Sequence, residues 1–148
     1  MKTRLCLATL AAALSFATTS HAADAALAAA AKEAGAVVTA SGLVYRSLKD
    51  GSGASPKASD TVKVNYRGTF PDGKEFDSSY KRNKAIEFPL ANVIPCWTEG
   101  VQRMKIGGKA KLTCPASIAY GSRGAGGGAI PPNATLLFEV ELLAINGQ

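Results

Sequence analysis

Histidine is almost missing from this chain, because His21 is the single imidazole among 148 residues. We expect His21 to leave with an N-terminal signal peptide, so that the mature chain has no histidine. This absence excludes catalysis by a Ser-His-Asp or Cys-His arrangement, and it excludes histidine-ligated metals. We therefore expect no metal site in this protein.

Cysteine is scarce as well, with three residues in the chain. Cys6 lies in the predicted signal peptide, and Cys96 and Cys114 are too few for a zinc site by themselves. In an oxidising compartment these two can pair. A loop of this length would add about 3 kcal/mol of stability in the loop-entropy model. The sequence leaves two alternatives open, a disulfide and two buried thiols.

The chain has no run of one charge and no basic stripe with interleaved aromatic residues. It carries 17 basic and 11 acidic residues, and removal of residues 1–22 leaves 15 basic residues against the same 11. Such a mild positive excess suits solubility or loose attraction to acidic surfaces. We expect no nucleic-acid partner.

No hydrophobic run in the sequence is long enough to span a bilayer. The run from Leu5 to Ala17 follows a short basic start, and Ser20 and Ala22 supply the small residues that suit a signal peptidase. We predict a signal peptide over residues 1–22, export to the periplasm, and no stable membrane insertion after cleavage. Outer-membrane association and the cell surface are further destinations, and an uncleaved membrane anchor is the alternative.

The remaining chain divides into a short tether and one domain. Residues 23–40 are rich in alanine and have few large side chains, so we predict a tether that forms at most a frayed helix. A dimerising helix is the alternative, although Gly35 interrupts it. We predict that residues 41–148 form a single compact domain with a core of its own.

Alternation of apolar and polar residues predicts several strands in this domain. Val62, Val64 and Tyr66 alternate with polar residues, which is typical of a half-buried strand. Further strands are expected over residues 43–48, 74–77, 86–88, 109–114 and 135–145. Residues 122–129 are dense in glycine, which predicts a mobile or tightly turning loop.

One short helix is expected, because Trp97, Val101 and Met104 fall on a single helical face. Pro95 suits its first turn, and Gly107 suits a C-terminal cap after about three turns. An antiparallel sheet with one helix against it is an α+β fold.

Several short segments occur in order along the domain, and each is weak evidence by itself. They read VNYRG from Val64, DGKEFDSS from Asp72, VIPCW from Val93, AYG from Ala119, IPPNATL from Ile130 and FEVEL from Phe138. Together, from residue 41 onward, they resemble the FKBP family of macrolide-binding prolyl isomerases. The exported bacterial members, including the macrophage infectivity potentiator-like group, are the most similar. This resemblance implies a bent antiparallel β-sheet wrapped around one short α-helix.

The resemblance also implies an apolar, aromatic pocket. Trp97 would form its floor, and the backbone N–H of Ile94 and the hydroxyl of Tyr120 would hold substrate carbonyls. Asp77 would lie at the mouth, held by Arg82. The family positions expected to be catalytic are Tyr66, Phe76, Asp77, Trp97, Tyr120 and Phe138, and those expected to bind substrate are Ile86, Val93, Ile94, Ile130 and Arg82.

By this resemblance the expected partners are proline-containing unfolded or exported polypeptides and macrolide inhibitors of the FKBP class. Rotation about an X–Pro bond breaks no bond, so it needs no nucleophile, metal or cofactor. The alternative function is a non-catalytic binding or chaperone module for proline-containing segments.

The chain departs from the FKBP pattern in two places. The loop before Ile130 is richer in glycine than usual, which should loosen the grip on substrate or macrolide. Cys96 stands where glycine is common, beside the pocket floor. If Cys96 pairs with Cys114, oxidation would brace Trp97.

Overall fold

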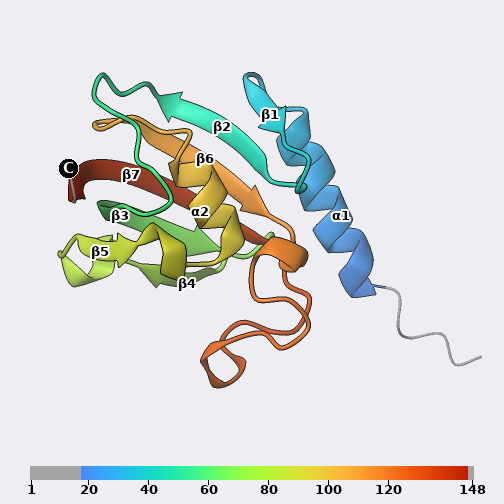
Figure 1. Cartoon of the computed structure of the whole chain (residues 1–148). Helices are drawn as coiled ribbons and strands as arrows, with labels where there is room; N and C mark the ends of the chain where they lie inside the picture. The colour runs from blue at the N-terminus through green and yellow to red at the C-terminus, as the bar shows by residue number, and fades with distance from the viewer. Residues whose placement is uncertain (1–17, 147–148) are drawn as a thin grey trace, which may run out of the picture.

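A seven-stranded antiparallel sheet forms the body of the molecule, which the computed structural model describes over residues 18–146 (Figure 1). The strand order is β1-β2-β6-β7-β3-β4, and β5 pairs with β3 beside β4. The strands are β1 (Ala36–Val38), β2 (Val44–Lys49), β3 (Thr61–Thr69), β4 (Glu75–Ser78), β5 (Ile86–Pro89), β6 (Lys109–Cys114) and β7 (Leu136–Asn146). The helices are α1 (Thr18–Ala31) and α2 (Pro95–Val101), with short 3₁₀ turns η1 (Tyr80–Arg82), η2 (Leu90–Asn92), η3 (Ala116–Ile118) and η4 (Gly126–Gly128).

Strands β3 and β7, the two longest strands, pair with each other and show the predicted alternation. Val62, Val64 and Tyr66 are buried, whereas Lys63 and Arg67 are exposed. On β7 every second residue from Leu136 to Leu142 is buried. These side chains pack on one face of the sheet against α2, so the α+β fold with a short helix against an antiparallel sheet is confirmed.

Helix α2 is shorter than the sequence predicts. It has seven residues and ends at Val101, so the prediction of about three turns was wrong. The N–H of Met104 bonds to the carbonyl of Val101 at 3.1 Å, and this tighter turn leaves Met104 buried without extending the helix. Gly107, the predicted cap, instead has a φ of +87° in the turn that leads into β6.

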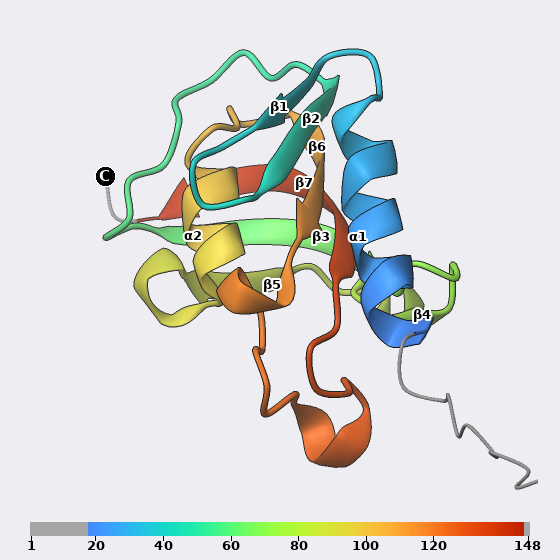
Figure 2. The same cartoon turned by 90° about the vertical axis from the view of Figure 1, so that its right-hand side faces the viewer.

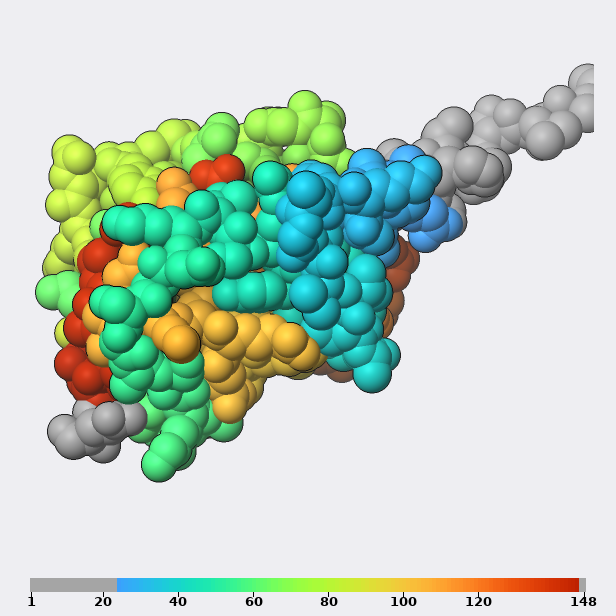
Figure 3. Space-filling model, turned by 90° about the horizontal axis from the view of Figure 1, so that it is seen from above, coloured from blue at the N-terminus to red at the C-terminus, as the bar shows by residue number. Residues whose placement is uncertain are grey.

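The loop after β2 crosses the turn that follows α2 (Figure 3). The N–H groups of Ser52 and Gly53 both approach the carbonyl of Ile106, at 3.2 and 3.4 Å. A Cβ atom on Gly51 would lie 2.4 Å from the carbonyl oxygen of Lys105, so the close crossing requires glycine there. The crossing closes the end of the core beyond α2.

Most of helix α1 and all of strand β1 lie within residues 23–40, the predicted tether that forms at most a frayed helix, and α1 begins before it, at Thr18. Helix α1 covers the face of the sheet opposite α2, and β1 extends the sheet edge beside β2 (Figure 2). After α1, Glu33 binds Arg46 on β2 at 2.8 Å and Lys111 on β6 at 2.7 Å. The sheet therefore begins before the predicted domain boundary, because backbone pairing and ion pairs hold a segment that has few large apolar side chains.

Most of the predicted signal peptide, residues 1–17, lies outside the described residues. Within residues 18–146, no helix has the length and apolar character needed to cross a membrane. Helix α1 continues through the predicted cleavage point after Ala22.

Candidate active site

A cavity of about 250 Å³ lies beside α2 on the face of the sheet that this helix covers. Its lining comes from β3, β4, β5, the segment before α2, α2 itself, the loop after η3, and β7. The lining residues are Tyr66, Phe76, Asp77, Phe88, Asn92, Val93, Ile94, Trp97, Tyr120 and Phe138. Segments far apart in the chain therefore meet at one hollow, and most of its surface is aromatic or aliphatic.

Trp97 forms the centre of the aromatic lining. Its ring meets those of Tyr66, Phe88 and Phe138 edge to face, with centroids 5.2, 5.5 and 5.4 Å apart. Such edge-to-face contacts favour particular ring orientations and contribute stabilising free energy beyond that from the burial of apolar area. The indole N–H of Trp97 is buried and has no acceptor within residues 18–146. Trp97 is thus packed among three aromatic rings, and its indole N–H stays without a partner in the described part of the chain.

Gly68 on β3 allows two aromatic walls to approach the sheet backbone. A Cβ atom at this position would lie 2.5 Å from the ring of Phe76 and 3.0 Å from the ring of Phe138. These two rings meet edge to face at 5.6 Å. The absent side chain of Gly68 therefore creates the space that the walls occupy.

Asp77 at the mouth of the cavity is held by three donors. The hydroxyl of Tyr66 donates a short hydrogen bond to Oδ2. Arg82 donates to Oδ1 at 2.6 Å, and the backbone N–H of Ser78 donates to the same oxygen at 2.9 Å. Arg82 also donates to the Tyr66 hydroxyl at 3.1 Å. The carboxylate therefore fixes the tyrosine ring in the wall.

These contacts determine the charge states at the mouth. Burial raises the pKa of the Asp77 carboxyl, but the hydrogen bonds from Tyr66 and Arg82 outweigh burial and hold its pKa below the ordinary value. Burial, followed by the hydrogen bond to Asp77, raises the pKa of Tyr66 to about 12. Near neutral pH, Asp77 is ionised and Tyr66 is protonated, so neither is a natural proton donor or acceptor for a reaction.

Besides the indole N–H of Trp97, the lining presents two further donors, from Ile94 and Tyr120, for which the structure shows no acceptor within residues 18–146. The backbone N–H of Ile94 is free, while its carbonyl accepts the N–H groups of Trp97 and Thr98 at the start of α2. The hydroxyl of Tyr120 makes no hydrogen bond in the described part of the chain, and this residue is 39% exposed. Both donors are available to a ligand.

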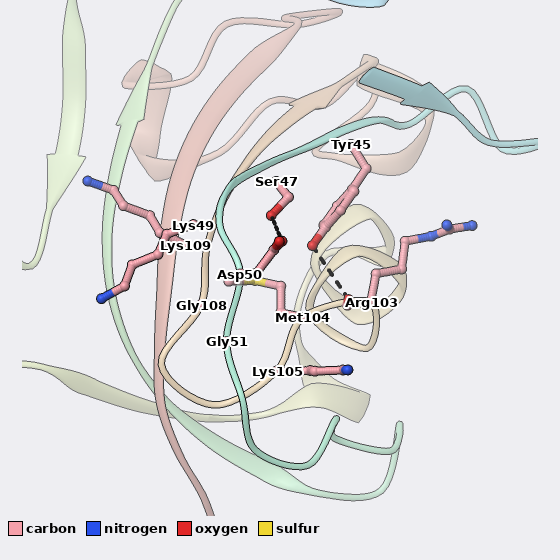
Figure 4. Close-up of a pocket in the computed structure, with 10 residues that line it drawn as sticks. All are labelled: Tyr45, Ser47, Lys49, Asp50, Gly51, Arg103, Met104, Lys105, Gly108 and Lys109. Atoms are coloured by element: carbon pink, nitrogen blue, oxygen red, sulfur yellow. Dashed lines mark hydrogen bonds between the residues drawn. The ribbon is translucent and has the colours of Figure 1, made fainter. Parts of the chain in front are cut away.

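A second cavity, of about 220 Å³, lies between β2 and the turn after α2 (Figure 4). It is lined by Tyr45, Ser47, Lys49, Asp50, Gly51, Arg103, Met104, Lys105, Gly108 and Lys109. Ser47 is bonded to Asp50 at 2.7 Å. The lysines at 49 and 109 extend to one side in Figure 4, and the cations at 103 and 105 extend to the other. These charges do not converge, so the aromatic cavity is the better candidate site.

Comparison with known proteins identifies the family. A profile described as FKBP-type peptidyl-prolyl cis-trans isomerase matches residues 53–143. The chain belongs to this family. The sequence is 54% identical over 115 residues to the isomerase FkpA of Escherichia coli K12, covering 78% of this chain and 42% of that protein. The chain therefore spans less than half the length of that FKBP relative.

Solved FKBP structures agree with the fold. The crystal structure of FkpA from Escherichia coli aligns with a TM-score of 0.82 and 48% identity, over 85% of this chain and 58% of that one. A peptidyl-prolyl cis-trans isomerase from Pseudomonas syringae pv. tomato DC3000 aligns with a TM-score of 0.78 and 37% identity, over 90% of this chain and 99% of that one. The family and the fold implied by the sequence are thereby confirmed.

Most of the expected FKBP pocket residues meet at the aromatic cavity. Three do not line it. Arg82 acts on Asp77 and Tyr66 from outside, Ile86 packs against the core from β5, and Ile130 is buried where it pairs with Ala125. Direct contact of these three with substrate stays a prediction. The residues of the expected set that line the cavity are Tyr66, Phe76, Asp77, Val93, Ile94, Trp97, Tyr120 and Phe138.

Two residues of the FKBP cavity were missed in the sequence, Phe88 and Asn92. Phe88 has the same parity on β5 as Ile86, and the strand register pairs it with Val62 in the core. An aromatic residue on the inward face of a strand next to β3 was therefore a usable signal. Asn92 ends η2, and no pattern in the sequence distinguishes it.

Proposed function

We propose that this protein is a peptidyl-prolyl cis–trans isomerase that accelerates rotation about X–Pro bonds. The observation that carries the proposal is the cavity itself, which is lined by Trp97 and other aromatic rings and by hydrogen-bond donors without partners in the described residues. Membership of the FKBP family supports it. Because the cavity holds no ready nucleophile or base, a reaction that breaks no covalent bond suits it best.

Amide resonance opposes this rotation, and the resulting barrier is about 18–20 kcal/mol. In the twisted transition state the resonance is lost, and the carbonyl is less polar than in the planar amide. An apolar cavity floored by Trp97 therefore disfavours the planar amide relative to the twisted one. Catalysis by this route is differential binding, and it requires no chemical step from the protein.

The two free donors would orient the substrate. The N–H of Ile94 and the hydroxyl of Tyr120, both from residues that line the cavity, would hold substrate carbonyls. Fixing these groups lowers the entropy cost of reaching the twisted form. Asp77 would act indirectly, by holding the ring of Tyr66 in the wall.

The proposed substrates are proline-containing segments of unfolded or exported polypeptides, and macrolides of the FKBP class are the proposed inhibitors. A signal peptide over residues 1–22 and a periplasmic location follow from the sequence pattern and remain part of the proposal. The isomerase domain would extend from residue 41 to residue 148, and residues 23–40 would be its alanine-rich tether.

The test is cis–trans exchange of a short X–Pro tetrapeptide with and without a macrolide. We expect the wild type to accelerate exchange and the macrolide to suppress it. Tyr120→Phe should lower kcat/KM about fivefold, which corresponds to the loss of one hydrogen bond worth about 1 kcal/mol. Tyr80→Phe is the matched control, because Tyr80 is similarly exposed, at 43%, and does not line the cavity.

An active macrolide-sensitive wild type with an impaired Tyr120→Phe variant and a normal Tyr80→Phe variant would support the proposal. A wild type that leaves exchange unchanged would overturn it. If such an inactive protein still suppressed aggregation of a proline-rich client, the cavity would belong to a binding module instead.

A further inference from the structure

Cys96 and Cys114 are joined by a disulfide, one of the two alternatives that the sequence left open. Both residues are fully buried in the core, and their Cα atoms lie 5.9 Å apart. Cys96 is next to Trp97, and it lies two positions after Ile94. The covalent link therefore attaches directly to the segment that supplies the floor and one free donor of the cavity.

The disulfide and the close approach of Gly100 to Leu112 both help to align α2 with β6. Cys96 and Gly100 are four residues apart on one face of the helix, which is a rise of about 6 Å. Cys114 and Leu112 are two residues apart on one face of the strand, which is about 6.6 Å. A Cβ atom on Gly100 would lie 2.8 Å from Leu112. Because the spacings match, both contacts can form together. Cys96 is bonded to Cys114 and Gly100 lies against Leu112, so the helix runs antiparallel to the strand.

Besides the disulfide, the N-terminal end of α2 is held by the aromatic packing of Trp97 and by a few side-chain hydrogen bonds. The helix has seven residues, too few to be stable in isolation, and Ile94 supplies no side-chain cap. The hydroxyl of Thr98 donates to the carbonyl of Leu90 at 2.6 Å, and Ser41 donates to Glu99 at 2.5 Å. Without the disulfide, the first turn of α2 would be held by the hydrogen bond from Thr98 to Leu90 and by the packing of the Trp97 ring.

The other end of the disulfide leads to a second segment of the cavity lining. Pro115 and the turn η3 follow Cys114 at once, and this turn carries the chain to Tyr120. The N–H of Gly121 bonds to the carbonyl of Ala116 at 2.9 Å, which fixes Tyr120 relative to the start of that turn. One covalent bond thus connects the floor segment to the segment with the second free donor.

We propose that the Cys96–Cys114 disulfide is a positioning device for catalysis, so that its reduction lowers turnover by the folded protein. The inference rests on the proposed isomerase function. Reduction is a two-electron step. The S–S bond breaks, each sulfur gains one proton, and a dithiol reductant is oxidised to its own disulfide. The product keeps both thiols in the core but releases the link between the two segments of the cavity lining.

The test compares the oxidised chain with the same chain unfolded and refolded in dithiothreitol. Because both sulfurs are buried, reduction needs this transient unfolding. Thiol titration must show two more free thiols afterwards. We expect kcat/KM for an X–Pro tetrapeptide to fall about tenfold, mainly through kcat, because small displacements of an orienting group are costly. Trp97 is the single tryptophan, so its fluorescence reports the floor directly and should change on reduction.

Two variants separate positioning from stability. Cys96→Ala combined with Cys114→Ala should match the reduced wild type and be insensitive to dithiothreitol. Leu142→Ala is the control, because Leu142 is buried on β7 and does not line the cavity. It should lower the unfolding midpoint while keeping kcat/KM of the folded protein and its sensitivity to reduction.

If reduction lowers only the unfolding midpoint and leaves kcat/KM and Trp97 fluorescence of the folded protein unchanged, the disulfide is merely structural and the inference is wrong. This failure differs from a failure of the proposed function, in which the oxidised wild type itself does not accelerate exchange. Should the double variant not fold, the refolded reduced wild type still decides the question.

Discussion

Gly68 determines how closely the walls of the pocket approach strand β3. Carbon atoms in proteins make their best contacts at about 3.5–4.0 Å. A methyl group on Gly68 would lie well inside that distance from both Phe76 and Phe138. Since Phe138 also contacts Trp97, a displaced wall would disturb the floor.

We predict that Gly68→Ala lowers kcat/KM about tenfold and lowers the free energy of unfolding by about 1–3 kcal/mol, as overpacking does. Steady-state exchange kinetics and denaturant unfolding measure the two effects. Gly73→Ala is the control. Gly73 has a φ of +89° but no atom near an added Cβ, so it should lose about 1 kcal/mol through backbone strain without losing activity. Equal kinetics in the two variants would contradict the role given to Gly68.

Asp77 and Tyr66 make the stability of the folded protein depend on pH in opposite directions. The pKa of Asp77 is lowered in the folded state, so its stabilising contribution is present above its ordinary pKa and is lost as pH falls through the lowered value. The pKa of Tyr66 is raised to about 12, so its contribution is present below the ordinary value and is lost as pH rises toward 12. Between these extremes neither residue changes charge.

At the scale of elements, apolar patterns predicted the strands well. The alternation over Val62 to Tyr66 and over Leu136 to Leu142 was sufficient, because each strand has one face against the core. The length of α2 was overestimated because Met104 keeps the helical spacing after the helix has ended. Burial of Met104 comes from a turn, which side-chain spacing alone does not distinguish from another helical turn.

Strand β1 was not predicted, because its three residues have no alternation to detect. Val37 and Val38 are 47% and 56% exposed, so β1 depends on pairing with β2 and not on burial.

Glu33 lies just before β1 and binds two cations. The hydrogen bond from Lys111, followed by that from Arg46, lowers the pKa of Glu33. In the strand register Arg46 lies opposite Lys111, so Glu33 also screens two like charges.

We predict that Glu33→Gln lowers the free energy of unfolding by about 0.5–1 kcal/mol, since both ion pairs are partly exposed. It should leave kcat/KM unchanged, because Glu33 does not line the cavity and the helix before it, α1, lies on the face of the sheet opposite α2 (Figure 2). Denaturant unfolding at low and high salt measures the effect, which salt should reduce. Asp24→Asn on α1, the helix that precedes Glu33, is the control and should be neutral. A change in kcat/KM of Glu33→Gln would show that the two faces of the sheet are coupled.

At the scale of the whole molecule, the family resemblance predicted more than composition or periodicity did. Default reasoning assigns Trp97 and Phe138 to the core, and both are indeed buried. Periodicity does not show that these rings line a cavity together with residues from segments that are distant in the sequence. The pairing of Cys96 with Cys114 was left open for the same reason, because closure depends on a distance that only the packed fold defines.

The central claim is that the pocket accelerates prolyl rotation by preferring the twisted amide, with no proton transfer. The pH dependence of cis–trans exchange of one X–Pro tetrapeptide tests it most directly. The account predicts clear acceleration with a constant kcat/KM from about pH 5 to about pH 9, because Asp77 and Tyr66 titrate outside that interval. A bell-shaped or sloping profile in that interval, or no acceleration at any pH, would contradict it.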